Sequence, residues 1–182
     1  DLEAHADLLE RLVTEMDGRV SAMPSRADTV QPSEGCPLIV TVLEEYPGLI
    51  RAASQAPKPK TGLKLVERIQ GAVGRLVSEG HKAGFRLVLI AQRADASFMG
   101  GYERGQFACR ISFAQADPEA LEMLHPGTRS RAEEHGAAPK GVALVTAPGR
   151  QLTRMRAPYL DDYGSYCDRI AAFSARLRDT AV

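Results

Sequence analysis

The sequence predicts an α/β fold in which a mostly parallel sheet is flanked by helices. Two short apolar runs rich in β-branched residues, over 37–43 and 85–91, have the composition of strands buried on both faces. Segments with apolar residues at helical spacing precede and separate these runs, and such alternation favours a parallel sheet. The 182 residues suffice for one domain with its own core, and they contain no internal repeat.

The first half of the chain is expected to run helix, strand, helix, strand. Leu8, Leu12 and Met16 lie on one face of the first helix, and charged residues fill the other. Gly84 is expected to end the second helix. The expected elements are a helix over 2–16, a loop over 23–35, a strand over 37–43, a loop over 52–62, a helix from residue 63 and a strand over 85–91.

The second half is expected to contain shorter elements. A strand over 109–113 precedes a helix ending at Leu124, for which Asp117 is the expected N-cap and Pro118 the first residue. Two strands, over 141–146 and 151–156, are predicted to pair as a hairpin around Pro148-Gly149, and a helix over 161–178 follows.

Composition restricts the class of protein. Hydrophobic residues make up 44% of the chain and charged residues 25%, which is ordinary for a globular domain. Lys+Arg and Asp+Glu number 23 each, so the formal net charge is zero. The protein is therefore not a simple polybasic nucleic-acid binder. Any such contact must come from a local patch or from several subunits that line one channel.

Cysteine and histidine show no pattern of a metal or disulfide site. Cys36, Cys109 and Cys167 lie far apart, form no C-x-x-C pair and fit a reducing compartment. The four histidines have no metal-ligand spacing and are expected to be structural or surface residues. Neither a membrane-spanning apolar run nor a signal peptide is present in the sequence. Because the chain starts at Asp1, we expect it to be part of a longer protein.

The ends of the two apolar strands carry the most informative polar residues. Glu44 and Glu45 follow the first strand, and Gln92 and Arg93 follow the second. Ligands of open parallel sheets bind beyond the carboxyl ends of the strands. One acid can hold the water shell of a metal ion while another orients and deprotonates an attacking water. A Gln amide can sense a terminal phosphate, and an Arg can neutralise developing charge. The pattern therefore predicts phosphate hydrolysis.

Each of these residues also has a structural interpretation. The two acids can form a solvated strand end, Gln92 and Arg93 can cap a strand, and Arg110 can serve in a salt bridge. The basic face of the helix after residue 63 can be a solvated surface. Lys60-Thr61 resembles the end of a phosphate-binding loop, but Pro59 lacks an N–H group and the glycines of G-x-x-x-x-G-K-[ST] are missing.

Five segments in a fixed order carry a family resemblance. They are LERLVTEMDGRVSAM (9–23), LIVTVLEEYPGLI (38–50), RLVSEGHKAGFRLVLIAQR (75–93), FACRISFAQA (107–116) and GVAL (141–144). These segments resemble the motor domain of FtsK/SpoIIIE DNA translocases, especially the conjugative transfer (TraB/TraSA-like) proteins of actinomycete plasmids and integrative elements. The second segment resembles the Walker B strand followed by D-E-x-x-x-L. The third is similar to R-x-x-G-I-H-L-x-x-A-T-Q-R-P.

The resemblance implies a RecA-like P-loop NTPase core that is incomplete at its N-terminus. Residues 1–182 would be a single motor-domain fragment, from Walker B onward and preceded by one helix. ATP and Mg²⁺ would be the cofactors. Glu45 would polarise the attacking water, and Glu44 would occupy the place of the Mg²⁺-associated aspartate. Gln92 would sense the γ-phosphate with Arg93 beside it, and Arg110 would supply a charge across the subunit interface.

The implied activity is ATP-driven translocation of double-stranded DNA by a hexameric ring, in conjugative transfer of a plasmid or integrative element. The motor domain would lie on the cytoplasmic side of the bacterial cell membrane and be attached to it only through a missing N-terminal region. Arg68, Arg75, His81 and Lys82 are the candidates for residues that face the duplex or a subunit interface.

Two features limit the resemblance. The Walker A loop of the family would lie upstream of Asp1, so these 182 residues alone are expected neither to bind ATP tightly nor to hydrolyse it. Glu44 replaces the usual Asp, Ala91 the usual Thr and Ala94 the usual Pro. These departures leave open a divergent motor or a non-catalytic interaction module. A type VII secretion ATPase, which moves proteins, is the other enzyme that the resemblance allows.

Overall fold

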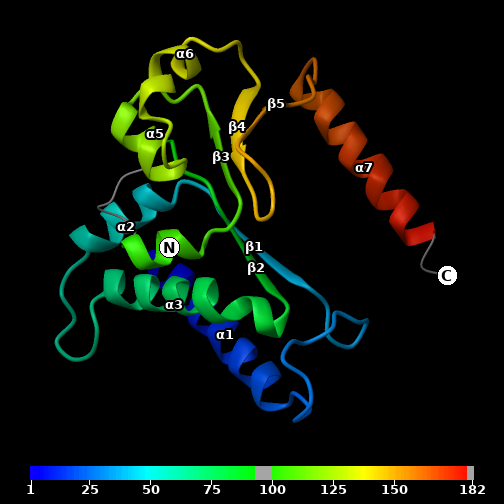
Figure 1. Cartoon of the computed structure of the whole chain (residues 1–182). Coiled ribbons are helices and arrows are strands. Elements are labelled where there is room, and N and C mark those ends of the chain that lie inside the picture. Colours follow the sequence, from blue (N-terminus) through cyan, green and yellow to red (C-terminus); the bar gives the residue numbers. More distant parts are fainter. Residues whose placement is uncertain (93–99, 180–182) are drawn as a thin grey trace. The chain divides into compact units, whose positions relative to one another are not determined.

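The structure, a computed structural model, describes residues 1–92 and 100–179. The chain divides into two compact units, residues 1–108 and residues 109–182, which we describe separately (Figure 1). Arg93 and Ala94, two of the positions singled out in the sequence, lie outside the described residues.

The first unit consists of a two-stranded parallel sheet and helices packed against it. Ile39 lies opposite Phe85, and Leu43 lies opposite Leu89, so the two apolar strands are parallel neighbours as predicted. The elements of this unit are α1 (Leu2–Ser21), β1 (Ile39–Leu43), α2 (Tyr46–Gln55), α3 (Leu65–Glu79), the 3-10 helix η1 (Gly80–Ala83), β2 (Phe85–Leu89) and α4 (Gly101–Gln106).

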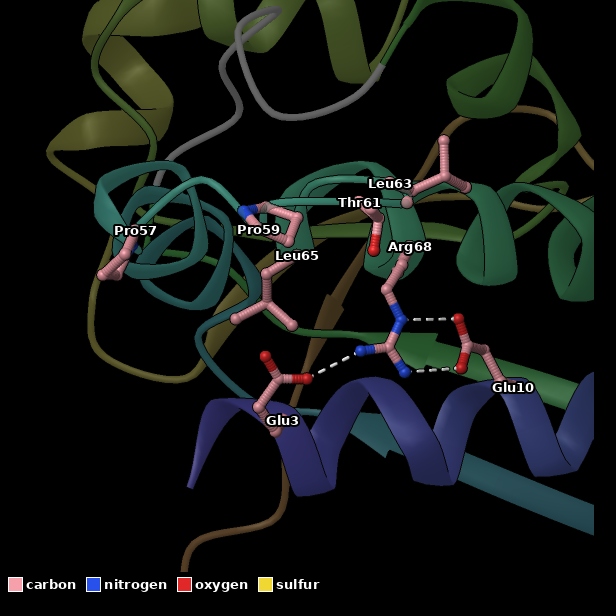
Figure 2. A pocket seen from close by; sticks show the side chains of 9 residues that line it. Glu3, Glu10, Pro57, Pro59, Thr61, Leu63, Leu65 and Arg68 are labelled. Atoms are coloured by element: carbon pink, nitrogen blue, oxygen red, sulfur yellow. Dashed lines mark hydrogen bonds and ion pairs between the residues drawn. The ribbon is translucent and has the colours of Figure 1, made fainter.

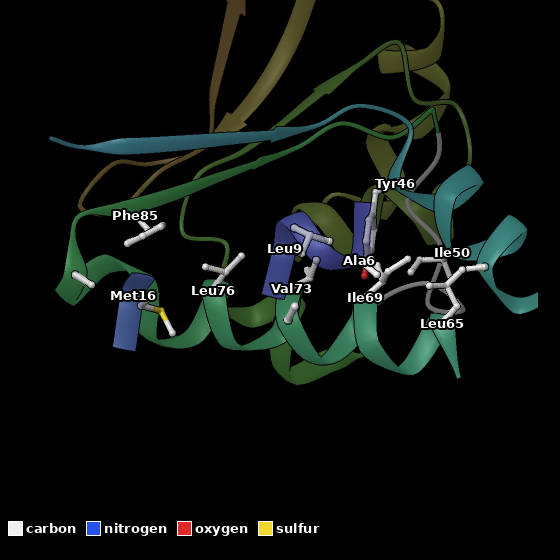
Figure 3. Packing of buried hydrophobic residues seen from close by; sticks show 13 residues of the cluster. Ala6, Leu9, Met16, Tyr46, Ile50, Leu65, Ile69, Val73, Leu76 and Phe85 are labelled. Atoms are coloured by element: carbon white, nitrogen blue, oxygen red, sulfur yellow. The ribbon is translucent and has the colours of Figure 1, made fainter. Parts of the chain in front are cut away.

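The core of the first unit lies between α1, α3 and one face of the sheet (Figure 3). The apolar positions of α3 repeat at helical spacing, so they form one stripe that α1 and the strands cover. Burial of one such aliphatic side chain contributes roughly 1.5–3 kcal/mol. The fully or almost fully buried members include Leu9, Met16, Ile69, Val73, Leu76 and Phe85.

The strands of this unit are not buried on both faces, and that prediction is wrong for the described chain. Val40 and Val42 of β1 are 53% and 56% exposed, and Val88 of β2 is 43% exposed. Side chains alternate between the two faces of a strand, and α1, α2 and α3 pack against one face only. The apolar runs predicted the strands correctly, but they do not indicate whether one or both faces of the sheet are covered by other elements.

The second unit contains a three-stranded antiparallel sheet in the order β3-β4-β5. A single, mostly parallel sheet required the strand over 109–113 to extend the parallel sheet. This strand instead pairs antiparallel with the next strand in the chain. The predicted hairpin is confirmed. The elements are β3 (Arg110–Phe113), α5 (Pro118–Leu124), the 3-10 helix η2 (Arg129–Arg131), α6 (Ala132–Gly136), β4 (Val142–Thr146), β5 (Thr153–Arg156) and α7 (Tyr163–Asp179).

The start of α5 confirms the predicted cap. The Asp117 carboxylate accepts hydrogen bonds from the backbone N–H groups of Glu119 and Ala120, and Pro118 occupies the first turn. Leu121 is fully buried and packs with Leu144 of β4. The capped helix is thus held against the sheet, and its C-terminal end is fixed beside β3 and β4.

No helix within residues 1–92 and 100–179 has the length and apolar character needed to cross a membrane.

Candidate active site

The carboxyl ends of β1 and β2 lie at the same edge of the parallel sheet. Beyond the last strand pair, the Ile90 N–H donates to the Leu43 carbonyl at 2.9 Å, and the Tyr46 N–H donates to the Ile90 carbonyl at 3.3 Å. The two chain segments therefore remain side by side as they leave the strands. Glu44 and Glu45 follow one strand tip and Gln92 follows the adjacent one, which is the neighbourhood that the sequence predicts.

Glu45 stands at the turn from β1 into α2 in a left-handed backbone conformation, with φ 54° and ψ 45°. Non-glycine residues adopt positive φ uncommonly, and such residues concentrate at turns and functional sites. The Glu45 carbonyl accepts from the Gly48 and Leu49 N–H groups and so opens the first turn of α2. Its carboxylate makes no capping hydrogen bond, which leaves this exposed side chain available for another role.

Tyr46 and Gly48 fix the surroundings of Glu45. The Tyr46 ring is 2% exposed and anchors the start of α2 in the core, and burial together with the negative charge of Glu103 raises the pKa of Tyr46 to about 12. A Cβ added at Gly48 would lie 3.2 Å from the Glu45 Cγ. The absence of a side chain at Gly48 therefore leaves the space in which the Glu45 side chain lies.

The residues at this strand edge fit a Mg²⁺ ion that is held jointly by the protein and a bound nucleotide, rather than by protein side chains alone. Within the described residues no three His, Cys, Asp or Glu side chains gather to hold a metal ion. Mg²⁺ typically binds one or two carboxylates together with substrate phosphates and water. Glu44, exposed at the tip of β1, can supply one such carboxylate.

Two arginines predicted to face DNA or a subunit interface are instead engaged within the first unit. Arg68 of α3 lies 2.6 Å from carboxylate oxygens of Glu3 and Asp7 and 2.7 Å from Glu10, all on α1. Its hydrogen bond lowers the pKa of the Glu10 carboxyl, and these acids raise the pKa of Arg68. Figure 2 shows this pairing beside a cavity of about 420 Å³ lined by Pro57, Pro59, Thr61, Leu63 and Leu65.

Arg75 lies 2.7 Å from Asp17 of α1 and 2.8 Å from Glu79 of its own helix, and its hydrogen bonds lower the pKa of both carboxyls. Carboxylates around Arg68 and Arg75 would repel the phosphates of a duplex. The geometry therefore fits an α1–α3 clamp rather than the predicted DNA contact. His81 and Lys82, exposed on η1, are the remaining candidates.

Arg110 lies in the second unit, at the start of β3. The side chain is half-buried, and its Nη1 donates to the Leu124 carbonyl at 3.2 Å, at the C-terminal end of α5. The structure thus places Arg110 against a helix end.

A buried polar cluster beside Arg110 has no counterpart among the predicted sites. The Ser112 Oγ lies 3.0 Å from the His125 Nε2 and 3.1 Å from the His135 Nε2, and the His125 Nδ1 lies 2.7 Å from the Thr146 Oγ1. Both histidines are buried, and their spacing in the sequence does not show that they meet.

Burial holds both histidines in the neutral form. Burial, followed by the positive influence of His135 and Arg110, lowers the pKa of His125 to about 4. Burial also lowers the pKa of His135. A neutral imidazole donates at one nitrogen and accepts at the other, and the Ser112 and Thr146 hydroxyls can complement either tautomer.

Comparison with known proteins finds a sequence relative that is a DNA translocase. DNA translocase FtsK of Caulobacter vibrioides is 27% identical over 150 residues, which make up 82% of this chain and 16% of FtsK. No protein-family model matches the chain.

Two solved structures share the fold. The pCW3 conjugation coupling protein TcpA, in its monomer form with ATPγS, superposes with a TM-score of 0.70 and 24% identity over 89% of this chain and 46% of TcpA. The cytoplasmic domain of the type VII secretion ATPase EccC of Thermomonospora curvata gives a TM-score of 0.60 and 18% identity over 90% of this chain and 19% of EccC.

The chain spans less than half the length of each of these proteins. The chain is similar in sequence to part of a DNA translocase of the FtsK type, and it shares its fold with parts of TcpA and EccC.

Proposed function

We propose that this chain is the water-activating and phosphate-sensing part of an ATPase that translocates double-stranded DNA. The observation that carries the proposal is the parallel pairing of β1 with β2, which brings Glu44, Glu45 and Gln92 to one edge of the sheet. The similarity to two proteins, a DNA translocase and a conjugation coupling protein, supports DNA as the cargo.

Each residue at this edge has a distinct proposed role. The Glu45 carboxylate orients the attacking water and accepts its proton. Glu44 holds water molecules of the Mg²⁺ shell, and Mg²⁺, when bound, supplies charge neutralisation on the phosphates. The Gln92 amide donates to the terminal phosphate and so distinguishes ATP from ADP, with Arg93 next to it in the sequence. The exposed, uncapped carboxylate of Glu45 is consistent with this assignment.

The remaining parts of the proposed motor come from outside these residues. No segment of the 182 residues matches the phosphate-loop pattern, so another part of the complete protein must supply the N–H cradle and its lysine. We propose a hexameric ring with ATP between neighbouring subunits and with Arg110 acting on the nucleotide of the neighbour. Conjugative transfer at the cytoplasmic side of the cell membrane is the proposed setting.

The fold shared with EccC supports a second candidate, a secretion ATPase whose cargo is protein. Stimulation by duplex DNA distinguishes the two functions. ATP hydrolysis by the complete protein is expected to rise several-fold with double-stranded DNA and to lose this stimulation at high salt, because phosphate contacts release counterions. Hydrolysis that does not respond to DNA would favour the secretion function.

The isolated 182-residue chain is expected to bind Mg-ATP with a dissociation constant weaker than about 1 mM, since it lacks most of the phosphate ligands. Isothermal titration calorimetry measures this directly. Micromolar binding by the chain alone would show that the phosphates are held by residues that we have not assigned.

Replacement of Lys82 by Glu in the complete protein is expected to lower DNA-stimulated hydrolysis several-fold. It should also reduce, by about one, the slope of the logarithm of the DNA-binding constant against the logarithm of the salt concentration. Lys82 is exposed on η1, so the change should not disturb the core. Lys140→Glu, at an exposed position of the second unit, is the matched control and is expected to have no such effect. If DNA stimulates hydrolysis by the Lys82→Glu variant as strongly as hydrolysis by the parent protein, η1 does not contact the DNA.

Replacement of Gly48 by Ala is expected to lower kcat about threefold to tenfold without lowering the melting temperature. The added Cβ would displace the Glu45 side chain by a few tenths of an ångström, whereas alanine favours the helix by up to about 1 kcal/mol. Gly71→Ala on α3 is the matched control, because a Cβ there meets nothing within 4 Å. Equal kcat values for both variants would argue against a precise role for Glu45.

A further inference from the structure

Arg110 belongs to a closed ring of contacts that connects β3, β4 and the end of α5. Arg110 lies opposite Thr146 in the antiparallel pairing of β3 with β4. The Thr146 hydroxyl lies 2.7 Å from the His125 Nδ1, and the residue before His125, Leu124, accepts a hydrogen bond from Arg110 through its carbonyl. The Arg110 guanidinium is therefore held by the same helix end that His125 fixes to the sheet.

The end of α5 is fixed from several directions. The Thr128 hydroxyl donates to the His125 carbonyl at 2.5 Å, and the Glu122 carboxylate accepts from the N–H groups of residues 127–129. On the other side of the His125 ring, Ser112 connects it to His135. His125 is 1% exposed, so solvent does not compete for these contacts.

We propose that His125 is a positioning residue that holds the Arg110 side chain in the orientation required for its action on a neighbouring subunit's nucleotide. This inference rests on the proposed function, in which Arg110 supplies a positive charge to the transferring phosphate. The mechanism is indirect: the Thr146–His125 contact fixes the helix end, and the Leu124 carbonyl fixes the guanidinium.

The charges around the ring make this arrangement depend on a neutral imidazole. Burial disfavours a proton on His125, and the charges of His135 on α6 and of Arg110 on β3 add to this effect. Glu134 of α6, whose charge acts on His135, pairs with Arg154 of β5 at 2.8 Å. A proton on His125 would therefore place like charges side by side and weaken the hold on Arg110.

The test is a double-mutant cycle on ATP hydrolysis by the complete protein. Thr146→Val removes the hydroxyl and keeps the shape of the side chain, whereas Thr146→Ser keeps the hydroxyl. We expect Thr146→Val to lower kcat about tenfold with less than a twofold change in KM, because a group that acts on the transition state affects kcat. Thr146→Ser should retain the kcat of the parent protein. In the Arg110→Ala background, Thr146→Val should cause no further loss.

Three results would overturn the inference. They are an equal loss from Thr146→Val with and without Arg110, an unchanged kcat for Thr146→Val, and an unchanged kcat for Arg110→Ala. A general loss of folding is recognised by melting temperature, which a purely structural role would lower in both backgrounds. Glu45→Gln is measured in parallel. If that variant also retains full hydrolysis, the proposed function fails, whereas its inactivity together with any of the three results removes only the role of His125.

Discussion

Replacement of Glu45 by Gln in the complete protein is expected to reduce ATP hydrolysis by at least about 100-fold and to leave ATP binding intact. Gln has nearly the same shape as Glu, but its amide cannot accept a proton from water. The left-handed backbone at residue 45 and the turn into α2 should be preserved, since only a side-chain oxygen changes. Single-turnover hydrolysis and equilibrium nucleotide binding, measured on the same preparation, separate the chemical step from affinity.

Glu34→Gln provides the control for this experiment. Glu34 is exposed in the segment before β1 and carries no proposed role, so this variant should hydrolyse ATP like the parent protein. An unaltered phenotype of Glu45→Gln would favour the non-catalytic interaction module that the departures at Glu44, Ala91 and Ala94 leave open, because this strand edge would then take no part in the hydrolysis by the complete protein.

The second large effect is a loss of stability of the second unit in acid. The pKa of His125 is lowered to about 4 in the folded chain from an ordinary value of 6.5. The unfolded chain therefore binds a proton that the folded chain does not bind between these two values. The stabilisation is fully present above about pH 6.5, is lost as the pH falls toward 4, and amounts to on the order of 3 kcal/mol.

Hydrogen exchange monitored by mass spectrometry measures this effect where it arises. After correction for intrinsic exchange rates, the protection of β3 and β4 should fall between pH 7 and pH 4.5. His125→Gln should make the fall shallower because it removes the titrating ring, and His5→Gln, at an exposed position of α1, should leave it unchanged. The same pH dependence in the parent protein and in His125→Gln would mean that another group controls acid unfolding.

The features that the sequence predicts well are those with a local physical cause. The period of α3, the Asp117 cap and the turn at Pro148-Gly149 each depend on residues close together in the chain. The adjacency of Glu44-Glu45 and Gln92 was also predicted, because two apolar runs separated by a helix favour parallel neighbours.

Features that depend on the rest of the fold were missed. The helix α2 was not predicted because Pro47 and Gly48 are poor helix formers in the interior of a helix. Pro47 is nevertheless well suited to the first turn, where it lies. α4 and α6 have six and five residues, too few to show a helical period. The direction of β3 is set by its pairing with β4, which the apolar character of its residues does not encode.

The ion-pair and hydrogen-bond partners of polar side chains could not be predicted from the sequence either. The basic face of α3 that contains Arg68 and Arg75 resembles a solvated basic surface in the sequence. Glu79 lies one turn from Arg75, but the other acids that pair with these two arginines lie about 60 residues away on α1. The meeting of His125, His135 and Ser112 likewise requires β3, α5 and α6 to be in place.

A structure of the complete protein with a non-hydrolysable ATP analogue and Mg²⁺ tests the central claim most directly. We predict that the terminal phosphate lies beyond the carboxyl ends of β1 and β2, with Glu45 and Gln92 within hydrogen-bonding reach of it, directly or through one water. A triphosphate bound at another surface, with both of these side chains facing solvent, would contradict the claim.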